Sequence, residues 1–144
     1  MEPFVMSVNN AGEGHSAHWW ADANPTLHAI YFDGDEHPRI APVGAPFVLY
    51  IVRPDGASAV GGIGRVTGAP RRNAPGQWGT EVPCVLEMVC PADELAPVLS
   101  ERGIEGSACR PARRLSLDDF QHFVLAVATS INKRALTLAV RGSL

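Results

Sequence analysis

Three tryptophans are the residues of this sequence best suited to binding a flat or methylated ligand. Trp19, Trp20 and Trp78 lie in polar or glycine-containing stretches beside apolar runs, not inside them. A tryptophan in such a place is typical of a binding surface or pocket. Its flat face can enclose a methyl group or stack on a nucleobase, at about 1–3 kcal/mol per base. The alternative is that one or two of these side chains cover the hydrophobic core as lids.

Basic residues are concentrated in the second part of the chain. Residues 1–64 hold seven acidic and two basic residues, a net charge of −5, and residues 65–144 hold eight and ten, a net charge of +2. The basic residues form three clusters, which are Arg65 with Arg71 and Arg72, Arg110 with Arg113 and Arg114, and Lys133 with Arg134. Local patches of this kind can bind phosphate although the chain as a whole carries −3. Ordinary solvated surface explains any single cluster equally well.

Other motifs that carry chemistry are incomplete. The glycines of residues 62–64 lack GxGxxG spacing and no predicted helix follows them, so they indicate a bent strand rather than a phosphate loop. His15, His18 and Asp22 could ligate a metal, but no HExxH pattern occurs, and surface or structural histidines are the better interpretation. Cys109 stands beside an arginine, which lowers the pKa of an exposed thiol, yet no histidine is placed next to it. We therefore predict no catalytic residue, no metal and no cofactor.

The chain of 144 residues is long enough for one domain and too short for two ordinary ones, so residues 1–144 are interpreted as a single domain. Its longest unbroken apolar run is Phe47–Val52, and no segment approaches the roughly 20 apolar residues that cross a bilayer. The first residues lack the pattern of a secretory signal. The three cysteines match no zinc spacing, so we expect a reduced, cytoplasmic chain.

The residue pattern predicts an α+β fold. Strands are expected in the runs rich in β-branched and aromatic residues, at Phe4–Val8, Leu27–Phe32, Phe47–Val52, Ala57–Val66 and Val82–Val89. Helices are expected over Asp93–Arg102 and from Ser116 onward, because apolar residues recur there at helical spacing. Residues 132–144 fit either a helix or a strand. Hairpin connections favour a strongly bent open sheet or a small barrel, flanked by two or three helices, over a doubly wound parallel sheet.

The order of these pieces resembles the YTH/EVE branch of the PUA-like superfamily, whose members read modified bases. The resemblance covers about residues 3–125. It is carried by the opening strand at 4–9, the Trp19-Trp20 pair after a polar loop, the glycine-rich hairpin strand at 60–66, the Trp78 loop leading into 82–85, and the basic connector at 110–120.

In this family the two loop tryptophans form walls of an aromatic cage that holds a flipped base. The resemblance therefore implies Trp20 and Trp78 as cage walls, with Trp19 as the alternative to Trp20. It places groups that hydrogen-bond the base edge near Ser7, Asn9 and Ala21. It assigns contacts to phosphates to Arg71, Arg72, Arg110, Arg113 and Arg114. YTH readers commonly have a third aromatic before the later tryptophan, and this chain has none at 72–75. Either the cage has two walls, or Tyr31, Phe32 or Tyr50 completes it. The lysine that often follows the first strand of YTH readers is also missing.

The resemblance implies a non-enzymatic reader that binds nucleic acid carrying a modified base, with a nuclease or NTPase effector as a possible second partner and no membrane partner. One alternative is a protein-interaction or small-ligand module that binds a peptide or a free nucleoside. A second is a PUA-like hydrolase acting on a small amide or RNA, which would need a lysine or tyrosine in its pocket. The sole lysine, Lys133, follows the second predicted helix and counts against that alternative. DNA and RNA, and adenine and cytosine, all stay open.

Overall fold

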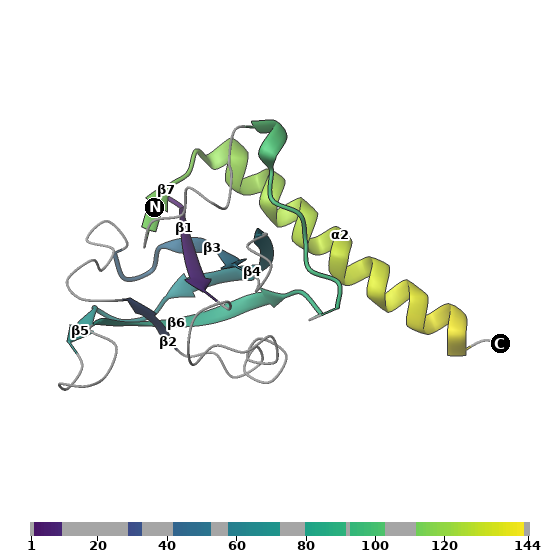
Figure 1. Cartoon of the computed structure of the whole chain (residues 1–144), viewed down its shortest axis with the longest axis horizontal. Helices are drawn as coiled ribbons and strands as arrows, with labels where there is room; N and C mark the ends of the chain where they lie inside the picture. Colours follow the sequence, from purple (N-terminus) through teal and green to yellow (C-terminus); the bar gives the residue numbers. More distant parts are fainter. Residues whose placement is uncertain are drawn as a thin grey trace.

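The computed structural model describes residues 2–9, 29–32, 42–52, 58–72, 80–91, 93–102 and 112–142. These residues form a mixed sheet and a long α-helix, so the predicted α+β class is confirmed (Figure 1). The strands are β1 (Phe4–Asn9), β2 (Ala29–Phe32), β3 (Pro46–Val52), β4 (Ser58–Val66), β5 (Arg71–Arg72), β6 (Thr80–Val89) and β7 (Ala112–Arg114). The helices are the short 3-10 helix η2 (Ser100–Arg102) and α2 (Leu117–Gly142).

The strands follow the order β2-β6-β4-β3-β1-β7, and β5 also pairs with β6. Strand β3 lies inside this order because it is antiparallel to β4 and parallel to β1. Strands β4 and β5 pair with successive parts of β6, at Cys84–Val89 and at Thr80–Glu81. The chain from β4 to β5 therefore follows β6 almost along its full length, as one bent arm of a long hairpin.

The glycine-rich strand β4 is irregular, as the sequence predicted. Its pairing with β6 shifts register between Ile63 and Gly64. A Cβ atom added to Gly64 would lie 2.4 Å from Cζ of Phe47 and 2.6 Å from the carbonyl oxygen of Val85. A Cβ atom added to Gly62 would lie 2.3 Å from the carbonyl oxygen of Met88. Glycine is required at both positions because the neighbouring strand and side chain occupy the space of any larger residue.

The core has two parts, one on each face of β3. Phe47, Leu49 and Ile51 lie in the first part, and Val48 and Tyr50 lie in the second, so alternate residues of one strand serve both. This explains why the sequence of β3 is an unbroken apolar run, since a strand buried on both faces has no polar side.

Helix α2 covers the second part of the core. It buries Phe123, Val127 and Ser130, and the ring of Phe123 meets the ring of Tyr50 edge to face at 5.7 Å between centroids. Its first turn is capped by Ser116, where the helix was expected to begin, because the backbone N–H of Asp119 donates to Oγ of Ser116 at 3.1 Å. The helix continues to Gly142, which settles the ambiguous segment 132–144 in favour of a helix over the described residues.

The predicted helix over Asp93–Arg102 is wrong. Only Ser100–Arg102 is helical, as a single 3-10 turn, and Ala96 instead forms a bridge with Val60. The bridge has two hydrogen bonds, from Val60 N–H to the Ala96 carbonyl at 2.8 Å and from Ala96 N–H to the Val60 carbonyl at 3.0 Å. Pro97 lies inside the predicted helix and has no N–H to donate, so an extended path that uses Ala96 satisfies the backbone better.

Two short strands were also absent from the prediction. Strand β5 (Arg71–Arg72) precedes the Trp78 loop, and strand β7 (Ala112–Arg114) lies in the basic connector at 110–120, where no strands were expected. Both are short and polar, and their pairing depends on partners distant in sequence, β6 for β5 and β1 for β7. Among the described residues α2 is the one α-helix, so the predicted two or three flanking helices are not confirmed.

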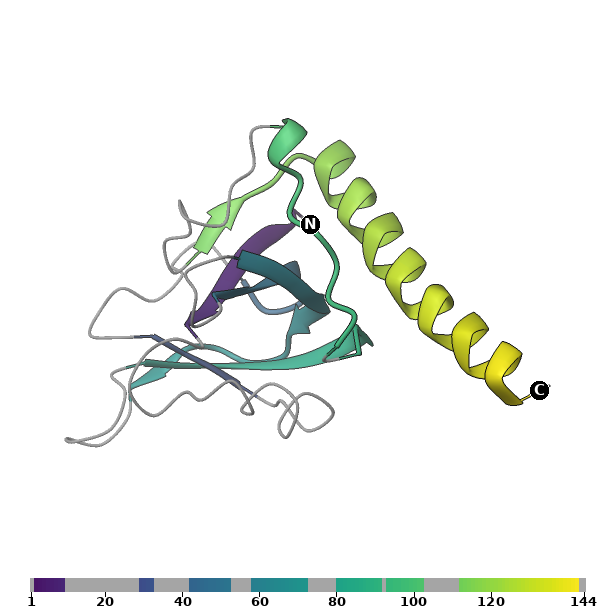
Figure 2. The same ribbon diagram turned by 45° about the vertical axis from the view of Figure 1, so that its right-hand side comes forward.

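Helix α2 is also long and apolar enough, by length and composition alone, to cross a membrane. The sequence did not predict such a helix because no unbroken apolar run occurs there: Lys133 and Arg134 interrupt the apolar residues of α2. Figure 2 shows the helix lying along one side of the sheet, with the segment 93–102 between them. A helix of this kind is weak evidence for a membrane, and its first half is bound to the sheet through buried side chains.

Candidate functional site

The end of the sheet formed by β2, β6 and β5 brings together three residues that the sequence singled out. Tyr31 of β2 pairs with Glu81 of β6, and Glu81 pairs on its other side with Arg71 of β5. Tyr31, Glu81 and Arg71 therefore form one row across three strands, although forty residues separate Tyr31 from Arg71 in the sequence. The next row contains Phe32, Thr80 and Arg72 in the same manner.

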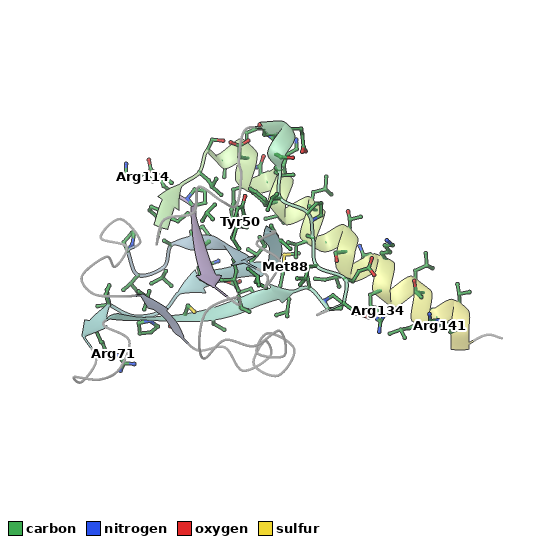
Figure 3. All side chains as sticks on the ribbon, viewed as in Figure 1. Tyr50, Arg71, Met88, Arg114, Arg134 and Arg141 are labelled. Atoms are coloured by element: carbon green, nitrogen blue, oxygen red, sulfur yellow. The ribbon has the colours of Figure 1, made fainter. Side chains whose placement is uncertain are left out.

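Trp78 lies outside the described residues, in the sequence between β5 and β6. Of the predicted site residues that the structure describes, Tyr31, Arg71 and Arg72 belong to one end of the sheet. Arg71 itself is exposed, and Figure 3 shows it at the tip of this end, away from α2.

A second group of predicted residues lies on β1 and β7. Ser7 and Asn9 pair with Tyr50 and Val52 of β3, so both lie in the final part of β1. Strand β7 pairs only with Phe4–Met6. Over Ser7–Asn9, β3 is therefore the one strand partner of β1 within the described part of the chain. An edge of this kind presents backbone N–H and carbonyl groups that can bind a ligand.

The two predicted phosphate-binding arginines of β7 lie towards the start of β1. Arg113 pairs with Val5 and Arg114 with Phe4. Arg114 is exposed and lies 3.5 Å from the carboxylate of Glu2, a surface ion pair that contributes little to stability. Figure 3 shows Arg114 and Arg71 at separate places on the molecule, so the structure divides the predicted phosphate contacts into two groups.

Strand β1 runs between the two groups of predicted residues, which are those on β7 and those on β2 and β5. In the order of the sheet, β1 is separated from β6 by β3 and β4. In Figures 1 and 2, however, the carboxyl-terminal end of β1 is directed over the bent sheet towards β2 and β6. Asn9, the last residue of β1, is therefore at the end of the strand that is directed towards β2 and β6. Arg113 and Arg114 pair with the other end of β1.

Several predicted site residues lie outside the described residues. These are Trp19, Trp20, Ala21, Trp78 and Arg110, together with the weaker metal and thiol candidates His15, His18, Asp22 and Cys109. Tyr50 is described, and its place removes it from the candidates for a third cage wall. Its side chain is fully buried in the core against Phe123. Tyr31 and Phe32, the other two candidates, lie on β2 in the rows that contain Arg71 and Arg72.

The basic cluster formed by Lys133 and Arg134 on α2 is bound to carboxylates. Lys133 lies 2.9 Å from Glu94, and Arg134 lies 2.9 Å from Asp93. The hydrogen bond and charge of Glu94 raise the pKa of Lys133. Of the three basic clusters in the sequence, this one therefore serves to fasten the segment 93–94 to the helix, which is a structural role.

A denser ionic cluster lies at the start of α2. Arg102 binds both Asp118 and Asp119, with Nε 2.5 Å from the Asp119 carboxylate, and its Nη1 is 3.3 Å from Nε2 of His122. The hydrogen bond from Arg102 is the main cause that holds the pKa of Asp119 below its ordinary value. The cluster is charged in both signs and largely satisfied internally, so it fixes η2 on the helix rather than offering a site for an anion.

The described cysteines are not nucleophiles. Cys84 and Cys90 are both buried, and burial raises the pKa of Cys84 to about 12 and raises that of Cys90 as well. A thiol with such a pKa is protonated at neutral pH. Among the residues that the structure describes, no three histidine, cysteine, aspartate or glutamate side chains are grouped closely enough to hold a metal ion.

Glu81 is the residue of this site that the sequence reading missed. It is the central member of the row that joins Tyr31 to Arg71. Its only signal in the sequence is a position three residues after Trp78, and its place in the row depends on strand pairing.

Searches of protein-family models and of curated proteins found no match to this chain.

Proposed function

We propose that this chain is a nucleic-acid-binding module that recognises a modified, methylated base at the end of the sheet formed by β2, β5 and β6. The observation that carries the proposal is the cross-strand row of Tyr31, Glu81 and Arg71 at the base of the segment that contains Trp78. Aromatic residues that stack on a base and arginines that bind its phosphate are the two components such a module needs.

The position of Arg71 supports the proposal. Strand β3 and helix α2 contribute to the core. Arg71 is exposed, at the end of the sheet that lies away from α2 (Figure 3). The resemblance to the YTH/EVE branch of the PUA-like superfamily supplies the finer part of the proposal, which is a flipped base between Trp20 and Trp78.

Each component has a separate role. Trp78, with Trp20 or Trp19, would contact the faces of the base, and Tyr31 would supply a third wall. The open edge of β1 at Ser7–Asn9 would hydrogen-bond the edge of the base. Arg71 and Arg72 would bind the phosphates that flank it.

The test is a titration of fluorescence anisotropy with short oligonucleotides. The panel is single- and double-stranded DNA and RNA, unmodified or carrying 6-methyladenine, 5-methylcytosine or 5-hydroxymethylcytosine. We expect preference for one modified strand, and loss of that preference in Trp78→Ala and Trp20→Ala, while Trp78→Phe keeps part of it because a ring still stacks.

Two arginine variants separate phosphate binding from unspecific attraction. Arg71→Gln should weaken binding to every sequence and lower the slope of log affinity against log salt by about one. Arg134→Gln removes the same charge from a residue bound to Asp93 on the helix and should leave that slope unchanged. Equal effects of the two variants, or no binding of any oligonucleotide at low salt, would overturn the proposal.

A further inference from the structure

Strand β6 contains a proline at a position with strand partners on both sides. Pro83 faces Ala29 of β2 on one side, and on the other its carbonyl oxygen accepts a hydrogen bond from the N–H of Thr67 at 2.9 Å. Inside a sheet, proline is normally confined to edges and bulges, because it has no N–H to donate to the ladder. Pro83 therefore indicates that the regular pairing of β4 with β6 ends at this residue.

The pairing changes directly beyond Pro83. Over the last residues of β4, each residue faces one residue of β6. After that, residues 68–70 lie between Thr67 and Arg71. On β6 a single residue lies between their partners, Pro83 and Glu81. The arm that runs from β4 to β5 thus has two more residues than β6 over this stretch, which makes residues 67–70 a β-bulge with more than the usual single extra residue.

This 67–70 bulge packs on the proline ring. A Cβ atom added to Gly68 would lie 3.1 Å from Cγ and 3.2 Å from Cβ of Pro83, which is tighter than an ordinary contact. Gly68 and Pro83 are half-buried, whereas Ala69 and Pro70 are exposed. Glycine therefore allows the close approach of the bulge to β6, and the bulge is a packed element of the sheet.

The 67–70 bulge lies at the boundary of the proposed binding end. The described pairing of β2 with β6 starts with Ala29 opposite Pro83, and β5 follows directly after the bulge, at the tip of the sheet (Figure 1). The rows that contain Arg71 and Arg72 lie beyond this boundary. A bulge bends its strand, increases the local twist and redirects the side chains that follow it. The two arginines are the first residues of β5 and follow the bulge without any intervening residue.

We infer that the 67–70 bulge positions the arginine pair of β5 for binding phosphate. This inference rests on the proposed function, because the backbone phosphates of a nucleic acid are the ligand it assumes. Without Ala69 and Pro70, the two strands would have equal numbers of residues between the same partners. A regular ladder would then still place Arg71 opposite Glu81. The two extra residues therefore add bend and twist rather than register, and these decide where the arginines are directed.

The test compares two variants in the anisotropy titration, with the oligonucleotide that wild type binds best. Deletion of Ala69 and Pro70 keeps both arginines. It should nevertheless weaken binding at least about tenfold and lower the slope of log affinity against log salt by about two, because two phosphate contacts are lost. Gly68→Ala should cause a smaller loss, because Pro83 has to move by only a few tenths of an ångström. Ala69→Ser is the matched control at the exposed neighbour of Gly68, and it should change neither affinity nor slope.

A double-variant cycle separates positioning from a general loss of stability. Arg71→Gln should weaken binding in wild type and have no further effect in the deletion variant, because the arginine no longer reaches phosphate there. A deletion that only destabilised the fold would lower the urea midpoint and leave the effect of Arg71→Gln in full. The same cycle with Gly68→Ala should show a reduced effect of Arg71→Gln, and it provides the test if the deletion prevents folding.

Two kinds of failure are distinguishable. Wild-type affinity and salt slope in both bulge variants, or a full effect of Arg71→Gln in the deletion variant, would overturn this inference and leave the proposed function in place. Absence of binding of any oligonucleotide by wild type at low salt would overturn both.

Discussion

The close contact between Gly64 and Phe47 leads to a specific expectation for Gly64→Ala. The new Cβ atom would lie 2.4 and 2.8 Å from two ring carbons of Phe47 and 2.6 Å from the carbonyl oxygen of Val85. All of these distances are shorter than an ordinary van der Waals contact. The ring of Phe47 is fully buried in the core, and the Val85 oxygen belongs to the paired strand β6. Neither neighbour can move without disturbing the packing or the strand ladder.

We expect Gly64→Ala to lower the free energy of unfolding by about 2–3 kcal/mol, in the range of one overpacked methyl group in a close-packed core. A domain of this size unfolds at a cost of about 5–15 kcal/mol, so the loss is easily measured. Replacing Phe47 by leucine in the same chain removes the ring carbons but not the Val85 oxygen. The double variant should therefore show a favourable coupling energy of about 1 kcal/mol and incomplete recovery.

The measurement is urea unfolding followed by far-ultraviolet circular dichroism. The midpoint should fall and the slope of free energy against urea should stay constant, since the surface exposed on unfolding is unchanged. Gly142→Ala is the control, because a Cβ atom there meets nothing within 4 Å, and it should be neutral or slightly stabilising. A loss below about 0.5 kcal/mol for Gly64→Ala would refute the pairing of β3, β4 and β6 described above, because surface changes alone reach that size.

Three further expectations follow from single contacts. Ser116→Ala removes the oxygen that accepts from the N–H of Asp119 and should cost about 1 kcal/mol in urea unfolding, while Ser116→Asp should cost much less. The pKa of Asp119 is held below its ordinary value, so its stabilising effect is present above the unfolded-state pKa of about 3.9 and is lost as pH falls through the folded-state pKa. Wild type should therefore be more stable than Arg102→Ala at pH 7, and the two should converge in acid; a constant difference would contradict this ion pair. Because Cys84 and Cys90 are buried with raised pKa values, peptide mapping after iodoacetamide treatment at about pH 8 should find both unmodified in the native chain and modified in urea.

Local pattern was enough to predict the five long strands and the start of the helix. Strand β3 has β-branched and aromatic residues between prolines. At the start of α2, the hydroxyl of Ser116 accepts a hydrogen bond from the backbone N–H of Asp119, three residues later. These signals act over a few residues, so they survive in any fold. The helix over 93–102 failed because apolar spacing outweighed Pro97, and the competing bridge of Ala96 to Val60 depends on a contact across thirty-six residues.

The sequence predicts which residue types belong to the candidate site, but it does not predict which of these residues lie together in the fold. Arginine clusters and loop tryptophans are visible in the sequence, yet their grouping depends on strand order. Register alone puts Tyr31 and Arg71 in one row and puts Arg113 and Arg114 on the far edge strand. The same argument applies to Tyr50, which is fully buried in the part of the core that α2 covers and meets the ring of Phe123.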